Sequence, residues 1–155
     1  TGPVALALTR QKLPLIDRTK YAAAENLAKG AYVLAEHGNF PDIILIATGS
    51  EVQHIIGAYE LLVTEAHVRL VCMPSWELFE RQPKEYRDSV LPPTAKKRLA
   101  VEAGSPMGWH KYVGDGGEIL GVTTFGHSAP VDVVMKQYGF TVENVVKKAK
   151  ELLGK

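Results

Sequence analysis

The sequence is poor in residues that build a covalent or metal-bound framework. It holds one cysteine, Cys72, inside the apolar run 68–73. One cysteine cannot form an intrachain disulfide or a zinc cage, which is typical of a protein from a reducing, cytoplasmic compartment. A buried structural thiol is the simplest interpretation of this residue. The five histidines show no metal-ligand spacing, so we expect no metal site in this chain.

Long apolar runs and an excess of one charge are also missing. No apolar stretch reaches the ~18 to 20 residues that a membrane span needs. Lys and Arg number 18 and Asp and Glu number 17, which gives a net charge of +1. Neither nucleic acid nor a membrane surface is therefore predicted as a partner. With 155 residues, 46% of them hydrophobic, the chain can still bury a substantial core.

Apolar runs alternate with helical patterns along the chain. Strands are expected at 4–9, 31–36, 42–48, 68–73, 98–102 and 118–122. Helices are expected at 21–29, 51–66, 76–79 and 109–113. Three more are expected to begin at Pro83, at a cap on Ser128 and at a cap on Thr141. This order predicts an α/β fold with three layers. Its sheet is mostly parallel, of about five strands with one antiparallel strand, and helices cover both faces. The short turn at 37–41 favours 31–36 and 42–48 as antiparallel neighbours.

Ligands of open parallel sheets bind beyond the carboxyl ends of the strands. The loops expected there are 48–51, 73–75 and 102–105. Gly49 allows close backbone approach, Ser50 can cap the following helix, and free N–H groups near Glu51 can attract an anion. A tight turn with capping residues is the simpler interpretation, because no G-x-G-x-x-G and no P-loop lysine accompanies this loop.

Two further motifs have a functional and a structural interpretation. Trp109, His110 and Lys111 lie between glycines and could form a docking surface, although packing of Trp109 in the core is the simpler alternative. Asp115 and Asn144 fit a loose G-D-G…N pattern of cofactor diphosphate and metal sites. We reject that site, because Asp115 lies in a turn before a strand and Asn144 in the first turn of an amphipathic helix. The sequence shows no catalytic residues of its own.

Several long phrases carry a resemblance to a known family. They read GPVALALTRQKLP, PDIILIATGSEV, VCMPSWELFERQ, YRDSVLPP, VEAGSPMGWHKYVG, FGHSAP and TVENVVKKAKELL. In this order they resemble the C-terminal portion of transketolases, over essentially the whole chain. The resemblance implies that residues 1–20 are the last strand of a pyrimidine-binding domain with a linker, and that residues 21–155 are the C-terminal domain.

The resemblance also implies an activity that this chain does not carry alone. Transketolases are homodimers that transfer a two-carbon ketol unit between sugar phosphates in the pentose phosphate pathway, with thiamine diphosphate and a divalent metal, Mg or Ca. The catalytic, cofactor and metal residues belong to the other domains. We therefore expect no cofactor on this chain, a structural and dimer-supporting role, and no activity of the chain in isolation.

One site residue follows from the family phrase A-L-[ST]-R-Q-x-L-P. Its arginine, Arg10 here, resembles the family's contact to the terminal phosphate of the substrate. A guanidinium is always charged, and its planar fork can bind phosphate oxygens in pairs. Two alternatives stay open: an anion- or nucleotide-binding regulatory α/β domain, and the small half of a split transketolase.

Overall fold

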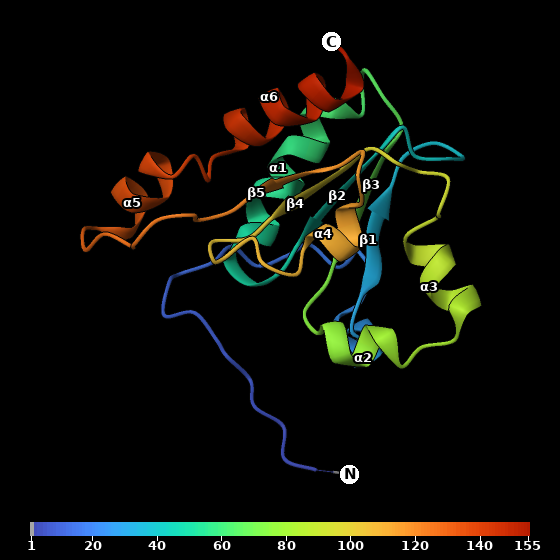
Figure 1. The fold of residues 1–155 in the computed structure, drawn as a ribbon, viewed down its shortest axis with the longest axis horizontal. Coiled ribbons are helices and arrows are strands. Elements are labelled where there is room, and N and C mark those ends of the chain that lie inside the picture. The colour runs from blue at the N-terminus through green and yellow to red at the C-terminus, as the bar shows by residue number, and fades with distance from the viewer. Residues whose placement is uncertain (1) are drawn as a thin grey trace.

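The computed structural model describes residues 2–155, and a five-stranded sheet lies at the centre of this part of the chain (Figure 1). The strands are β1 (Tyr32–Glu36), β2 (Ile43–Ala47), β3 (Val68–Cys72), β4 (Arg98–Val101) and β5 (Glu118–Leu120). Their order in the sheet is β1-β3-β2-β4-β5. Only β1 among them runs antiparallel to its neighbour, which confirms the expected mostly parallel sheet.

Helices connect the strands and follow the expected pattern closely. They are η1 (Ala24–Lys29), η2 (Gly49–Glu51), α1 (Val52–Leu62), α2 (Trp76–Glu80), α3 (Lys84–Val90), α4 (His110–Val113), α5 (Val131–Gln137) and α6 (Val142–Leu153). Thr141 caps α6 as predicted, since its side chain accepts a hydrogen bond from the Asn144 backbone N–H at 3.2 Å. The expected cap at Ser128 is wrong: α5 begins after Pro130, whose fixed φ suits a helix start. No helix in the described range is long and apolar enough to cross a membrane.

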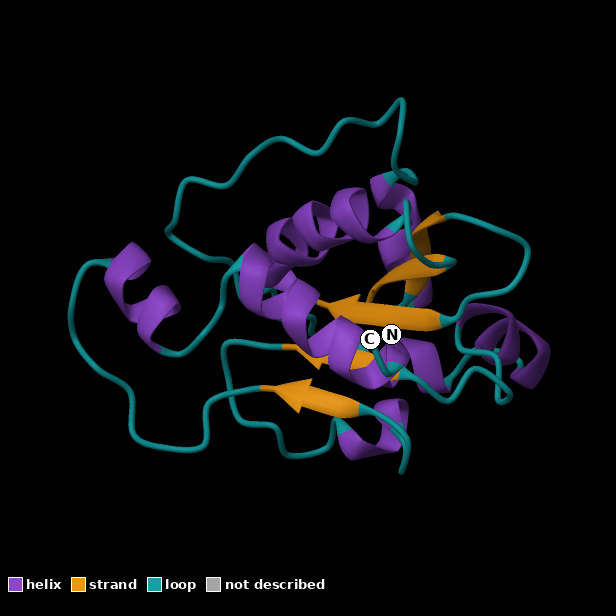
Figure 2. Cartoon of the chain, turned by 90° about the horizontal axis from the view of Figure 1, so that it is seen from above, coloured by secondary structure: helices purple, strands orange, loops and turns teal. Residues whose placement is uncertain are grey.

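The central strand β2 explains why helices cover both faces of the sheet. Its residues are all fully buried, and successive side chains of a strand point to opposite faces. Ile43 and Leu45 join the core that α1 and α6 cover, whereas Ile44 and Ile46 join the core beneath α2, α3 and α4. Figure 2 shows the strands between these two helical layers, with α5 set apart at one end of the molecule. The three-layer architecture is therefore confirmed.

The predicted pairing of β1 with β2 is wrong, because β3 lies between them. The connecting turn crosses the start of β3: the Asp42 backbone N–H donates to the His67 carbonyl at 2.8 Å, and the His67 N–H donates to Asp42 Oδ2 at 2.8 Å. Gly38, at φ +87°, passes so close to the His67 ring that a Cβ there would lie 2.3 Å from Cγ. Arg69 on β3 then pairs with Glu36 on β1, Nη2 to Oε1 at 2.6 Å.

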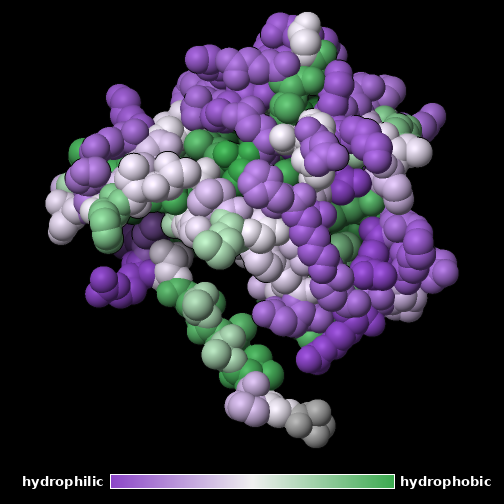
Figure 3. All heavy atoms as spheres, viewed as in Figure 1, coloured by the Kyte–Doolittle hydropathy of each residue, from purple (hydrophilic) through white to green (hydrophobic). Residues whose placement is uncertain are grey.

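Residues 2–20 form neither helix nor strand. Val4, Leu6 and Leu8 are 86%, 72% and 83% exposed, and the segment extends away from the body as a chain of apolar side chains (Figure 3). The strand expected at 4–9 is thus absent from the described structure. A strand forms only against a hydrogen-bonding neighbour, and residues 2–155 offer this segment none.

Candidate functional site

The loop after β2 is the first candidate site, and its geometry differs from a simple cap. Gly49 adopts φ +55°, and a Cβ there would meet open space. The cap predicted at Ser50 is wrong. The Ser50 hydroxyl instead donates to the Glu51 carboxylate, Oγ to Oε1 at 2.5 Å, and α1 has no side-chain cap. The Gln53 carboxamide donates to the Ser50 carbonyl at 3.0 Å. These contacts fold the loop tightly onto the start of the helix.

Negative charge gathers at this edge of the sheet. Glu51 is 4% exposed, and Glu102, which follows β4, is half-buried nearby. Burial, and next the charge of Glu51, raise the pKa of Glu102 from 4.5 to about 7. Burial also lowers the pKa of His54. Glu51, and Glu102 above a pH of about 7, would repel an anion, so phosphate binding at Gly49, Ser50 and Glu51 has an electrostatic cost and stays a prediction.

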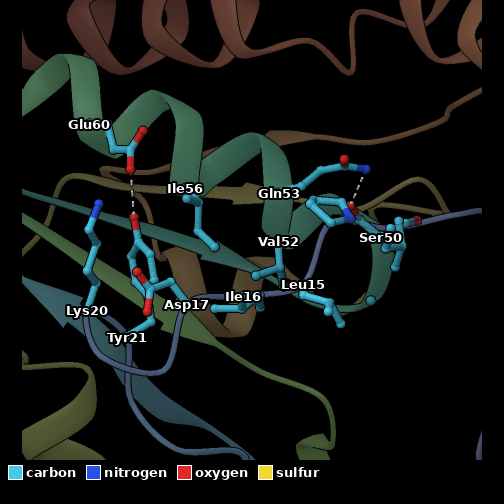
Figure 4. Close-up of a pocket in the computed structure, with 13 residues that line it drawn as sticks. Leu15, Ile16, Asp17, Lys20, Tyr21, Ser50, Val52, Gln53, Ile56 and Glu60 are labelled. Atoms are coloured by element: carbon cyan, nitrogen blue, oxygen red, sulfur yellow. Dashed lines mark hydrogen bonds between the residues drawn. The ribbon is translucent and has the colours of Figure 1, made fainter.

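A pocket of about 210 Å³ lies between the linker and the N-terminal half of α1 (Figure 4). Ile16 from the linker packs against the core that α1 covers, whereas Leu15 is fully exposed at the edge of the pocket. Ser50 and Gln53 lie at one end. At the other end the Tyr21 hydroxyl donates to Glu60 Oε1 at 3.1 Å. Burial and this bond raise the pKa of Tyr21 to about 12, so the phenol stays a donor at neutral pH. The pocket therefore marks where the linker docks on the domain.

Arg10 lies outside both features. It sits on the exposed N-terminal segment, and it makes no ion pair within residues 2–155. Its neighbour Gln11 is half-buried and lines a different groove, beside the loops that follow β4 and β5. The phosphate contact of Arg10 stays a prediction, because no described residue tests it.

Trp109, His110 and Lys111 divide between the core and the surface. Trp109 is 2% exposed and meets Trp76 edge to face, with ring centroids 5.2 Å apart. His110 is exposed, and the Lys111 ammonium pairs with Glu80 at 3.0 Å. A docking surface here stays a prediction, and only His110 and Lys111 offer side chains to it.

The side chains present do not fit a diphosphate and metal site. Asn144, the candidate ligand of the loose G-D-G…N motif, donates its carboxamide N–H to the Gly139 carbonyl at 2.9 Å within the α5–α6 connection. Asp115 lies in the turn before β5. In the described range no three His, Cys, Asp or Glu side chains are grouped so that they could share a metal ion.

Sequence patterns missed two features of the carboxyl edge. They placed Glu102 in a loop but gave no sign of its proximity to Glu51, because the two residues are 51 positions apart along the chain. They also did not single out Gln11 and His127, which line one groove from opposite ends of the chain. Only the sheet order, which sets β2 beside β4 and β4 beside β5, brings such pairs together.

The sheet with one antiparallel edge strand, covered by helices on both faces, defines an α/β domain. The model of the transketolase-like C-terminal domain matches residues 30–141. A transketolase from Geobacillus stearothermophilus is 52% identical over 155 residues, which cover 99% of this chain and 23% of that protein. The chain belongs to the transketolase family.

Solved structures agree with this assignment. Transketolase from Pichia stipitis, solved in complex with sedoheptulose 7-phosphate, superimposes with a TM-score of 0.82 at 33% identity, over 94% of this chain and 20% of that one. A split-gene transketolase, described as an inactive β4 tetramer, shares the fold with a TM-score of 0.63 at 18% identity, over 82% of this chain and 43% of that one. The chain thus spans about a quarter of the length of the curated relatives that it matches.

Proposed function

We propose that this chain serves as the C-terminal part of a transketolase that transfers a two-carbon ketol unit between sugar phosphates. The observation that carries the proposal is 52% identity to a transketolase along 99% of the chain. The complete enzyme would be a cytoplasmic homodimer that uses thiamine diphosphate and a divalent metal, Mg or Ca. The lone half-buried Cys72 suits a reducing compartment.

The role of residues 21–155 in that enzyme is structural. Their charged side chains do not fit the cofactor, so this chain supplies no step through it. Ile16 of the linker packs against the core, and Tyr21, the first residue of the domain, donates to Glu60 on α1. These contacts fix the end of the linker that adjoins the domain. The chain by itself binds no thiamine diphosphate and transfers no ketol units.

Arg10 has a separate role, in binding substrate. The exposed alternation of Val4, Leu6 and Leu8 suits a strand that adds to the sheet of the neighbouring domain. Such a strand would carry Arg10 at its end and aim the guanidinium at the pocket of that domain. There it would bind the terminal phosphate of a sugar phosphate and orient the substrate, while taking no part in carbon–carbon bond cleavage.

The test is Arg10→Ala in the complete enzyme. We expect KM for phosphorylated substrates to rise about tenfold or more, since charge-assisted hydrogen bonds are lost, with little change for unphosphorylated analogues. Lys12→Ala, which removes an exposed cation two residues away, is the matched control and should change neither value. An equal effect of Arg10→Ala on both classes of substrate would refute the phosphate contact.

A second candidate is the small half of a split transketolase. Its support is the fold shared with the split-gene protein, of which this chain covers 43%. The test is the length of the natural reading frame beside the intact mass of the expressed protein. A frame no longer than about twice these 155 residues, as the 43% coverage of the split-gene chain implies, would favour the split arrangement. A frame about four times as long would exclude it.

A regulatory anion or nucleotide site has less support than either proposal. Its anion-binding loop would place negative charge beside Glu51, which is buried, and near Glu102. Soaking with phosphate tests this candidate, and an empty loop at Gly49–Glu51 would count against it.

A further inference from the structure

A second groove, of about 560 Å³, opens between the loops that follow β4 and β5, the N-terminal segment and α5. Its volume lies within the range of about 300 to 1,000 Å³ typical of small-molecule sites. It also lies at the carboxyl ends of parallel strands, where α/β sheets bind ligands. Neither the linker pocket nor the proposed phosphate contact at Arg10 uses this groove.

The chemistry of the lining selects against charge. Within residues 2–155 the groove is lined by no Asp, Glu, Lys or Arg side chain. Val122, Met135 and Phe140 supply apolar wall, and Phe140 is 2% exposed. An ionised group placed here would find no countercharge among these side chains. The groove therefore suits an uncharged molecule with an apolar body.

His127 gives the groove a hydrogen-bond acceptor of defined orientation. The Tyr138 hydroxyl lies 2.7 Å from the Phe125 carbonyl and 2.6 Å from His127 Nδ1. A carbonyl can only accept, so the single hydroxyl proton of Tyr138 goes to Phe125, and His127 Nδ1–H must donate to the hydroxyl oxygen. The neutral imidazole then carries its lone pair on Nε2. A ligand that meets this nitrogen must bring a donor.

Two other polar groups complement that acceptor. The Ser105 hydroxyl accepts from the Met107 backbone N–H at 3.3 Å, which leaves its own proton for a ligand. The carboxamide of half-buried Gln11 offers a donor and an acceptor. Donors and acceptors therefore lie along one open groove, in which His127 and Ser105 are exposed. A few placed polar groups on apolar walls are what orient small ligands.

We propose that this groove binds an uncharged small molecule with an apolar body and a carboxamide or a comparable group with both donor and acceptor atoms. The apolar body packs against Val122, Met135 and Phe140, and the N–H of the amide donates to His127 Nε2. The proposal concerns a site outside ketol transfer, so it stands or falls separately from the proposed function.

Benzamide and benzoate make a direct test, because they share a shape and differ in charge and in the amide donor. Each is titrated into the ¹⁵N-labelled 155-residue chain at pH 8 while amide chemical shifts are followed. Benzamide should shift the resonances of Gly104, Ser105 and Gly126 with a Kd on the order of a millimolar, as its size allows. Benzoate should bind at least about tenfold more weakly.

Substitutions assign the contact. His127→Ala should weaken benzamide about tenfold through the lost hydrogen bond, and His110→Ala, an exposed histidine outside the groove, should leave the affinity unchanged. The proposal is wrong if benzoate binds as tightly as benzamide, or if the His127→Ala variant binds benzamide as tightly as the unaltered chain does. It is also wrong if no resonance shifts up to about 20 mM benzamide. Groove shifts that follow protein concentration instead would identify a second copy of the chain as the occupant, and would overturn it equally.

Discussion

Glu102 is the residue through which pH should act on the stability of this domain. Burial, and next Glu51, raise its pKa from 4.5 to about 7, so the folded state holds a proton that the unfolded chain releases. Its contribution to stability is complete below pH 4.5 and is lost as pH rises through about 7. Replacement by Gln should increase the unfolding free energy at pH 8 by about 1 kcal/mol, after allowance for solvent screening of a half-exposed group.

Urea unfolding at pH 4 and pH 8 measures this effect. The gain from Glu102→Gln should be present at pH 8 and nearly absent at pH 4, where both states carry the proton. Asp115→Asn, in the exposed turn before β5, is a control that removes a carboxylate from a solvated position. An identical gain at the two pH values would mean that the substitution acts through packing and that Glu102 is not the titrating group.

Replacement of Trp109 tests whether this residue stabilises the core or forms a docking surface. Its ring packs against Trp76 and Tyr112, and only 2% of the residue is exposed. We expect Trp109→Ala to cost about 3 to 5 kcal/mol of stability, as truncation of a buried aromatic does. His110→Ala should change stability by less than about 0.5 kcal/mol. Thermal unfolding checks both values, and a stable Trp109→Ala protein with impaired assembly would favour docking.

Among the elements, the N-terminal segment has the surface most prone to association. It presents three apolar side chains and unpaired backbone groups, a combination that promotes pairing with another chain. Leu6→Glu with Leu8→Glu should reduce self-association in sedimentation experiments. The melting temperature should stay the same, because the two leucines lie outside both cores. A large drop in melting temperature would contradict the exposed position of the segment.

Local sequence signals predicted most elements but not their neighbours. The amphipathic period predicted α1 and α6, and the apolar run at 42–48 predicted a strand buried on both faces, as β2 proves to be. The short turn suggested that β1 pairs with β2, and this was wrong because β3 pairs with both. The Glu36–Arg69 ion pair and the hydrogen bonds between Asp42 and His67 stabilise that order, and these contacts join residues 25 to 33 positions apart.

The candidate site was less predictable than the fold. The loop at Gly49, Ser50 and Glu51 was placed at the correct edge of the sheet, yet the burial of Glu51 depends on tertiary packing. Likewise, the hydrogen bond between His127 and Tyr138 forms across a loop that has no periodic pattern. The proposed role of Arg10 comes from the family phrase, because nothing in residues 2–155 partners this side chain.

At the scale of the whole molecule, the described chain is a folded domain preceded by an exposed apolar segment. Two apolar cores lie on opposite faces of one sheet, Ile16 packs against one of them, and Tyr21 donates to Glu60 on α1. In the described part of the chain no three His, Cys, Asp or Glu side chains are grouped so that they could share a metal ion. About three quarters of the length of the curated relatives has no counterpart in this chain.

The most direct test of this account is a ketol-transfer assay on the 155-residue chain alone. The assay supplies thiamine diphosphate, Mg²⁺, a ketose phosphate donor and an aldose phosphate acceptor, after cooperative unfolding has shown that the chain is folded. We expect no transfer above the rate without protein. Transfer by the folded chain, lost on omission of thiamine diphosphate, would contradict it.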